Sequence, residues 1–572
     1  TIVKDQSFPS HVRKNLPDYK TVIEDPSYAS PLFEGNKRER MFDVVGSICM
    51  NKDKFAIDQV LNVNPQIGDL CITHDTGAYG GSSMTFNFNA KLQHAEILRR
   101  PTENMGSYQT EPATNAINNI KPLLCSEEEL RQMASIFQTP FQLYDKESIL
   151  KGARIFNESF AWTRSLTGMS FKNHFAIKAT PTPKILKILN EECGMGMDCC
   201  SLGELLLCEK LGIKGEDIIF TSNDTQFEEY RKAFELGAII NLDDFSQIDN
   251  LKKALGGIMP EIVSFRFNPG PLCTLPSNEV IGNPAQAKFG LTKAQLFSAY
   301  RKCKEYGVKR FGLHTMIKCY CLDVLELAKI SQMMFQLAVE IYQQTGVSLE
   351  FVDMGGGIGV KYRPEQQTVN LGDLGNRVKD LYEEIVLPCH GLHPLQIKYE
   401  CGALVTAEHG CLISRVINMK DTYKRFVGLD SSMADLIFQG ECEDYRDITI
   451  VKDQSFPSHV RKNLPDYKTV IEDPSYASPL FEGNKRERMF DVVGSICMNK
   501  DKFAIDQVLN VNPQIGDLCI IHDTGAYGGS SMTFNFNAKL QHAEILRVAP
   551  SRYEMIRRPQ TYDDHFATMI FP

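Results

Sequence analysis

The stretch NHFAIKATPTPKILKILNEECGMGMDCCS, at residues 173–201, has the pattern of a strand, a helix and a second strand. Its two ends, 173–179 and 196–201, are short and mostly apolar, while PTPKILKILNEE between them carries apolar residues at helical spacing. A helical crossover of this kind joins neighbouring parallel strands of one sheet. The stretch is therefore expected to be one repeating unit of the fold.

The same unit recurs between about residues 145 and 420. Amphipathic segments such as SLGELLLCEKLG and TQFEEYRKAFELG end near a glycine or a charge cluster, as helices do. Eight strands with helical crossovers in roughly 250 residues predict a (β/α)8 TIM-type barrel, and the count disfavours the alternative of a doubly wound sheet. The eight strand-like runs are NHFAIKA (173–179), GMDCCS (196–201), DIIFTS (217–222), AIINLDD (238–244), EIVSFRFNP (261–269), RFGLHTMI (310–317), LEFVDMGGG (349–357) and LQIKYECG (395–402).

After residue 420 the pattern changes to strands separated by Gly, Pro, Asn and Asp. Segments such as RFVGLD, ITIVKD, MFDVVGSICM and DLCIIHD predict a C-terminal β-sandwich or β-barrel domain, with a helix expected only around DKFAIDQVL. The strand PFQLYD (140–145), which precedes the barrel, is expected to pair with this second domain.

About a fifth of the chain is written twice. Residues 1–99 and 449–547 differ only at Thr73 and Ile521, which is far too similar for a solenoid repeat. The identity indicates a recent duplication or an artefact of the gene sequence. We expect four segments: a duplicate at 1–99, a linker and first β-domain strand at 100–145, the barrel at 146–418 and the C-terminal β domain at 419–572.

The composition is that of a soluble globular protein, with 43% hydrophobic and 23% charged residues. A net charge of −9 argues against a nucleic-acid or anionic-membrane partner. No apolar run reaches the roughly 18–20 residues of a membrane span, and TIVKDQSFPS lacks a signal-peptide core, so a cytoplasmic protein is expected. The 17 cysteines show no zinc or disulfide spacing, and no metal site is expected.

Three polar features follow predicted barrel strands, at the end where barrel enzymes place their active sites. Lys178 ends the first strand, either as a structural ion pair or as an amine for Schiff-base chemistry. Gly355 to Gly357 follow the seventh strand, where backbone N–H groups could bind a phosphate, and Glu400 ends the eighth. An amine, a phosphate cradle and a carboxylate together suit pyridoxal 5′-phosphate (PLP).

The order of many short blocks resembles one enzyme family. These blocks include FAIKAT, MDCCSLGEL, SFRFNPG, DMGGGIG, YECG, GSICMNKD and HDTGAYG. The chain resembles the alanine-racemase-like, fold-type III PLP-dependent decarboxylases, most of all the diaminopimelate and ornithine decarboxylases. The resemblance implies that Lys178 carries the cofactor and that Glu400 is the partner of its ring nitrogen. The remaining cofactor-binding residues that it implies are Asp198, Arg266, His314, Gly355, Gly356, Gly357 and Tyr527.

The resemblance also implies residues that act on the substrate. Cys497 would be the catalytic general acid, contributed by the partner subunit of a homodimer, while Asp501 and Tyr445 would bind substrate. From the residues alone, Cys497 could equally be a plain buried thiol, and Asp501 could cap a helix starting at DKFAIDQ. The identical Cys49 precedes the barrel and is expected to have no catalytic role, unless the first copy takes the place of the second in the β domain.

Some family positions hold different residues here, and most concern the substrate. Ala403 and Phe438 replace arginines, Cys442 replaces a tyrosine, Met498 replaces the glutamate after the catalytic cysteine, and Met316 replaces a ring-stacking histidine. The expected function is decarboxylation of a diamino or basic amino acid, diaminopimelate first and then ornithine or lysine. A non-catalytic homologue that acts as a binding or regulatory protein is the alternative, and a racemase is a weaker one.

Overall fold

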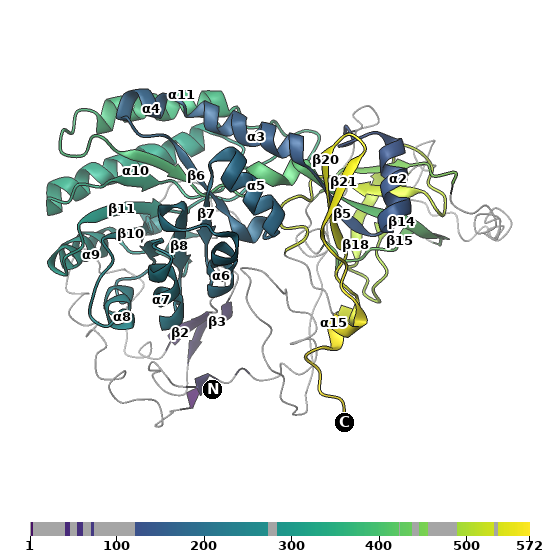
Figure 1. Ribbon diagram of the computed structural model, residues 1–572, viewed down its shortest axis with the longest axis horizontal. Helices are drawn as coiled ribbons and strands as arrows, with labels where there is room; N and C mark the ends of the chain where they lie inside the picture. Colours follow the sequence, from purple (N-terminus) through teal and green to yellow (C-terminus); the bar gives the residue numbers. More distant parts are fainter. Residues whose placement is uncertain are drawn as a thin grey trace.

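The chain forms a parallel barrel joined to a separate sheet domain (Figure 1). This computed structural model describes residues 121–272, 283–422, 424–436, 445–455, 489–530 and 536–572, and, within the first copy of the repeat, residues 2–3, 41–45, 54–60, 70–71 and 73.

All eight predicted barrel strands are confirmed. They close in the order β10-β11-β12-β13-β6-β7-β8-β9, each pair being parallel. Each observed strand falls within its predicted run apart from one residue, Lys172, at the start of the first. Their bounds are β6 (Lys172–Ala176), β7 (Gly196–Cys199), β8 (Ile218–Ser222), β9 (Ile239–Leu242), β10 (Ile262–Phe267), β11 (Arg310–Thr315), β12 (Phe351–Asp353) and β13 (Gln396–Tyr399).

Helices cover the outside of the barrel (Figure 1). In α5 (Pro183–Cys193) the apolar residues of PTPKILKILNEE are buried at helical spacing, and the helix ends at Gly194 with φ +67°, a conformation that glycine adopts at little cost. The other helices are α3 (Lys146–Ser159), α4 (Trp162–Thr167), α6 (Leu202–Leu211), α7 (Phe227–Glu235), α8 (Gln247–Ala254), α9 (Lys293–Glu305), α10 (Val324–Thr345), α11 (Leu371–Leu381) and the short α12 (Ala403–Thr406).

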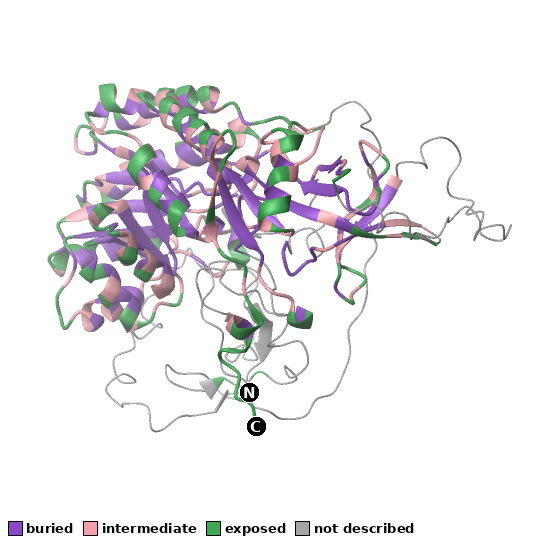
Figure 2. Ribbon diagram, turned by 45° about the vertical axis from the view of Figure 1, so that its right-hand side comes forward, coloured by how far each residue is buried: buried purple, intermediate pink, exposed green. Residues whose placement is uncertain are grey.

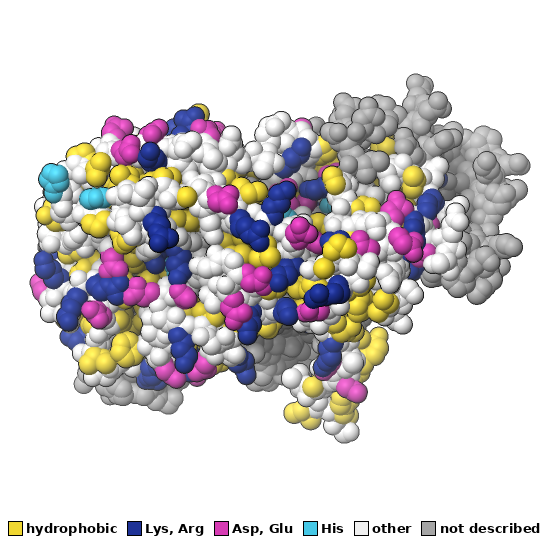
Figure 3. Space-filling model, turned by 45° about the horizontal axis from the view of Figure 1, so that its top comes forward, with side chains coloured by type: hydrophobic (Ala, Val, Ile, Leu, Met, Phe, Trp, Pro, Cys, Tyr) yellow, Lys and Arg dark blue, Asp and Glu magenta, His cyan; other side chains and the backbone are white. Residues whose placement is uncertain are grey.

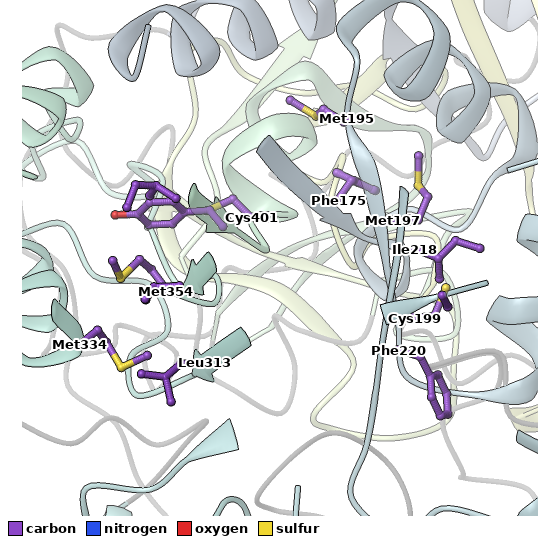
Figure 4. Packing of buried hydrophobic residues seen from close by; sticks show 14 of the residues in the cluster. Phe175, Met195, Met197, Cys199, Ile218, Phe220, Leu313, Met334, Met354 and Cys401 are labelled. Carbon is purple, nitrogen blue, oxygen red and sulfur yellow. The ribbon is translucent and has the colours of Figure 1, made fainter. Parts of the chain in front are cut away.

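The main core lies between the barrel strands and these helices. Figure 2 shows the strands buried while the outer faces of the helices are exposed. In Figure 4, Phe175, Met197, Ile218 and Phe220 from successive strands belong to this one apolar layer. Burial of large side chains on this scale is the main force that holds the barrel closed.

The second domain is a nine-stranded sheet. Its main path runs β18-β17-β15-β14-β5-β20-β21, with β19 paired to β14 and β16. The prediction that PFQLYD joins this sheet is confirmed, because β5 pairs with both β14 and β20. The strands are β5 (Phe141–Asp145), β14 (Gly410–Asp421), β15 (Arg425–Leu429), β16 (Ile448–Val451), β17 (Met489–Val493), β18 (Lys502–Val508), β19 (Leu518–Ile521), β20 (Ala543–Ala549) and β21 (Arg552–Arg557).

Two features of this domain differ from expectation. The helix expected around DKFAIDQVL is wrong, since these residues form β18, which pairs with β17 and buries Phe503 against the sheet. Its Phe, Ile and Val residues favour a strand once a partner is present. Strand β14 begins at Gly410, before the expected start of the second domain at 419. The helices of this domain are α2 (Glu127–Phe137), which packs on the sheet through Leu130 and Met133, and α15 (Tyr562–Phe566).

The described parts of the first copy repeat the pairings of the second copy. Strand β2 (Met41–Val45) pairs with β3 (Lys54–Val60) in the register of β17 and β18, and β1 (Ile2–Val3) pairs with β4 (Leu70–Cys71) in that of β16 and β19. In the second copy, β15 and β14 extend these pairs into a large sheet. Among the described residues, the first copy forms two-stranded sheets only.

Charges of both signs are interspersed over the face that Figure 3 shows. None of the helices in the described residues combines the length and apolar character needed to cross a bilayer.

The repeat provides a matched pair of substitutions. Phe503 is 4% exposed and packs in the core with Val427, Leu429 and Phe490, whereas its equivalent Phe55 is 63% exposed. We expect Phe503→Ala to lower the free energy of unfolding by about 3–5 kcal/mol, and Phe55→Ala to change it by less than about 0.5 kcal/mol. Denaturant unfolding of the two variants measures this difference. Equal losses would mean that both copies are packed alike.

Candidate active site

The lysine predicted at the end of the first barrel strand lies at the mouth of the barrel. Lys178 is in a 3-10 turn (Ile177–Ala179) directly after β6. Its Nζ lies 2.9 Å from Oδ2 of Asp198, at the end of β7, and 3.4 Å from Sγ of Cys200. Asp198 is fully buried, so the ion pair offsets part of the cost of removing both charges from water.

A second buried polar group contains the predicted Glu400 and His314. His314, on β11, has Nε2 3.1 Å from Oε2 of Glu400, and Nδ2 of Asn241 donates to its Nδ1 at 3.0 Å. Because Nδ1 accepts, Nε2 carries the proton and donates a hydrogen bond to the carboxylate. The neutral histidine therefore fixes the orientation of Glu400.

Asp353, at the end of β12, completes this group. Burial and the nearby Glu400 carboxylate raise the pKa of Asp353 to about 8, and its Oδ1 accepts the N–H of Gly355 at 2.9 Å. Ligand-type atoms of His314, Asp353 and Glu400 lie within 4.8 Å of one another, as in a metal site. The hydrogen bonds of His314 and Asp353 already use some of these atoms within the protein.

The glycine run after β12 packs tightly between two loops. Gly355 and Gly357 have φ values of +69° and +89°, which favour glycine. A Cβ on Gly356 would lie 2.7 Å from the carbonyl oxygen of Glu400, and one on Gly357 would overlap the carbonyl oxygen of Lys318. Only glycine allows the backbone to run this close to the ends of β11 and β13.

The segment 522–530 of the sheet domain docks on the turn that carries Lys178. The N–H of Tyr527 donates to the carbonyl of Ala179 at 2.7 Å, and Oγ of Ser530 donates to the carbonyl of Lys178 at 2.7 Å. Burial raises the pKa of the Tyr527 hydroxyl, while the positive charge of Lys178 acts to lower it. The structure thus places Tyr527 beside the lysine, although the two residues belong to different domains.

Two other predicted site residues, Arg266 and Tyr445, form polar contacts with neighbouring carboxylates. Arg266, on β10, has Nη1 3.5 Å from Oδ1 of Asp243 and lies over the ring of Phe289, 4.2 Å from its centroid. The hydroxyl of Tyr445 donates to Oδ1 of Asp447 at 2.9 Å.

Cys497 and Asp501 lie in the loop between β17 and β18. Cys497 is exposed, whereas Asp501 is buried and accepts backbone N–H groups from Met433 at 2.6 Å and Ile496 at 2.7 Å. Burial raises the pKa of Asp501 to about 6. Asp501 therefore holds the loop in shape, and it does not cap a helix. Among the described residues, neither side chain has a hydrogen bond or ion pair with the group around Lys178.

Some residues of interest were missed or lie elsewhere. The sequence patterns do not point to Asp353, Asn241 or Cys200 as site residues. For Asp353 a signal exists, because it lies at the end of a predicted barrel strand. Ala403 begins α12 and packs against the barrel core. Phe438, Cys442 and Cys49 lie outside the described residues.

Comparisons with known proteins identify the family. Residues 153–407 match the family described as pyridoxal-dependent decarboxylase, pyridoxal binding domain. Protein TabA from Pseudomonas amygdali pv. tabaci is 34% identical over 436 residues, which cover 76% of this chain and 92% of that protein. The chain belongs to the pyridoxal-dependent decarboxylases.

Other members of this family resemble the chain over similar lengths. Diaminopimelate decarboxylase from Methanothermobacter thermautotrophicus is 26% identical over 451 residues, 78% of this chain and 95% of that protein. The crystal structure of diaminopimelate decarboxylase from M. jannaschii with L-lysine is 25% identical, covers 77% of this chain and 94% of that one, and gives a TM-score of 0.65. The chain is thus a fold-type III decarboxylase, a carboxy-lyase with PLP as its cofactor.

The residues at the barrel mouth fit PLP. Lys178 provides an amine for the aldehyde, and Glu400 provides a carboxylate, already oriented by His314, for the ring nitrogen. Tyr527 has a hydroxyl of the kind that holds a phosphate, and the N–H of Gly357 is a backbone donor of that kind, whereas the N–H groups of Gly355 and Gly356 bond Asp353 and Sδ of Met316. The donor set therefore matches the three polar parts of the cofactor.

The segment that docks on the Lys178 turn begins with a histidine that resists protonation. Burial and the positive charge of Lys121 lower the pKa of His522 to about 3, and its Nε2 pairs with Oγ1 of Thr449 at 2.9 Å. In the unfolded chain the pKa is about 6.5. The unfolded state therefore binds a proton that the folded state does not, so stability is lost as the pH falls from about 6.5 toward 3.

We expect His522→Gln to reduce this acid sensitivity. The measurement is the midpoint temperature of thermal unfolding at pH 7 and at pH 5. This temperature should fall further in the unmodified protein than in the variant, because glutamine has no proton to gain. Identical losses in the two proteins would contradict a contribution from His522.

Proposed function

We propose that the chain decarboxylates a diamino or basic amino acid, with diaminopimelate as the first candidate and ornithine or lysine as the next. The observation that carries the proposal is the convergence of Lys178, Glu400 and the glycine run at one barrel mouth. The substrate class is supported by relatives named diaminopimelate decarboxylase and by solved relatives with bound L-lysine.

In this proposal Lys178 binds the cofactor and Asp198 positions the amine. The 2.9 Å ion pair holds Nζ at the barrel mouth, and Ser530 and Tyr527 fix the backbone of its turn from the other domain. Bound PLP supplies a ring that takes up the electron pair left when carbon dioxide departs. Glu400, which accepts a hydrogen bond from Nε2 of His314, would hold a proton at the ring nitrogen and so favour that uptake.

The general acid is proposed to come from a second subunit. Cys497 is exposed on the loop that Asp501 shapes, which leaves the thiol accessible to another chain. In a homodimer with shared active sites, this thiol would protonate the carbon atom that has lost its carboxylate. Tyr445 is proposed to bind substrate, and Asp501, whose carboxylate accepts the N–H groups of Met433 and Ile496, is proposed to contribute by shaping the loop that carries Cys497.

A non-catalytic homologue is the second candidate. It is favoured by Ala403, because a charge-assisted hydrogen bond from an arginine in that place would stabilise a bound carboxylate by about 1.5–3 kcal/mol. Such a protein would bind PLP but release no carbon dioxide.

Lys178→Ala should abolish both the visible absorption of the lysine-bound cofactor and carbon dioxide release. The assay follows carbon dioxide from diaminopimelate, ornithine, lysine and arginine. Lys172→Ala is the matched control, because Lys172 begins the same strand and pairs with Asp217 at the opposite end of the barrel. Normal absorption with no carbon dioxide from any of the four amino acids would favour the non-catalytic candidate.

Cys497→Ala should leave cofactor absorption intact and slow product formation about 100-fold or more, because a general acid contributes about that much. Cys49→Ala is the control, since the same sequence surrounds both cysteines and Cys49 should not matter. If Cys49→Ala slows turnover and Cys497→Ala does not, the catalytic thiol has been assigned to the wrong copy.

A further inference from the structure

A buried arginine lies next to the glycine run. Arg446, just before β16, is 4% exposed, and its Cζ lies 3.7 Å from the ring centroid of Tyr362. A cation this close to a ring face is held by the charge distribution of the ring. The guanidinium is therefore fixed in position rather than extended into water.

Two tyrosine rings connect Arg446 to the glycine run. Tyr362 follows the run in sequence, and its ring centroid is 6.0 Å from that of Tyr320. The segment that contains Tyr320 runs along the glycines, because the N–H of Cys321 donates to the carbonyl of Gly357 at 2.9 Å and that of Gly359 donates back to Cys321 at 2.8 Å. Arg446 thus lies at the edge of the proposed phosphate cradle.

Electrostatic contacts connect the same group to the lysine. The charge of Arg446 acts to lower the pKa of the Tyr320 hydroxyl, and the nearby Tyr527 hydroxyl acts to raise it. The charge of Lys178 acts to lower the pKa of Tyr527 in turn. Arg446 therefore belongs to the polar group at the barrel mouth, although it comes from the sheet domain.

The chemistry of the site requires a cation at this end. A phosphate carries up to two negative charges, and burying it without a positive partner is costly. Lys178 is proposed to bind the aldehyde, Lys318 is bound to Glu326 at 2.9 Å, and Arg266 lies 3.5 Å from Asp243. Arg446 is held near the glycine run by the Tyr362 ring and by a hydrogen bond from its Nη1 to the carbonyl of Tyr445 at 2.9 Å.

We propose that Arg446 binds the phosphate group of PLP and supplies the positive charge of the cradle formed by Gly355 to Gly357 and Tyr527. This inference rests on the cradle proposed above. A guanidinium with several N–H donors suits a phosphate, since it can donate two parallel hydrogen bonds to its oxygens.

The test compares PLP with pyridoxal, which lacks the phosphate. For Arg446→Met we expect PLP binding, measured by the absorption of the lysine-bound cofactor, to weaken at least about 10-fold while pyridoxal binding stays the same. Arg446→Lys keeps a positive charge and should recover part of the PLP affinity. Inorganic phosphate should raise the thermal midpoint of the cofactor-free protein more than that of Arg446→Met.

Arg363→Met is the matched control, because Arg363 lies over the neighbouring Tyr445 ring, 5.6 Å from its centroid, and should not change the ratio of the two affinities. Circular dichroism monitors folding, and Arg446→Lys replaces Arg446→Met if the latter does not fold. An unchanged ratio of PLP affinity to pyridoxal affinity in Arg446→Met would overturn the proposal. If both affinities fall together, the role of Arg446 is structural. If neither changes and only the KM for substrate rises, Arg446 binds a substrate carboxylate instead. Because binding needs no turnover, a chain that releases no carbon dioxide would still give a clear result.

Discussion

The turn that carries Lys178 depends on hydrogen bonds from the other domain. Ser530, 352 residues later in the chain, donates to the carbonyl of Lys178, and the N–H of Tyr527 donates to the next carbonyl. Neither domain alone contains both the lysine and the residues that hold its turn. The active site is thus a property of the interface between the barrel and the sheet, and its geometry depends on how firmly the two are joined.

The polar groups inside the barrel mouth depend on one another in a similar way. Lys178 is balanced by Asp198, Glu400 accepts a hydrogen bond from His314, and burial together with the Glu400 carboxylate raises the pKa of Asp353. Removing one member of such a set leaves its partner buried without compensation, which costs far more than the pair contributes. The tight glycine backbone between them limits how far these groups can move apart.

The sequence predicts the barrel well because its signals are local. Each strand is a short apolar run, each helix is amphipathic, and Lys178 and Glu400 come at the ends of strands that must end at the same rim, whereas Asp198 is expected only from the family resemblance. Features decided by distant partners were not predictable in this way. Strand β18 has a helix-like pattern that pairing with β17 overrides, and Asp501 could not be placed without the N–H groups of Met433 and Ile496. Arg446 carried no signal of its own, since only the fold brings it to the glycine run.

The position of β5 in the sheet has a consequence for how the protein is made. This strand lies between β14 and β20, so the barrel is inserted between strands that are neighbours in space. A ribosome completes β5 long before either neighbour exists, and the strand remains without its proper partners while the whole barrel is synthesised. The residues AEILR, which begin β20 at 543–547, have by then already been made once, at 95–99. A newly made chain of this sequence therefore contains the residues AEILR once before β5 and again at the start of β20.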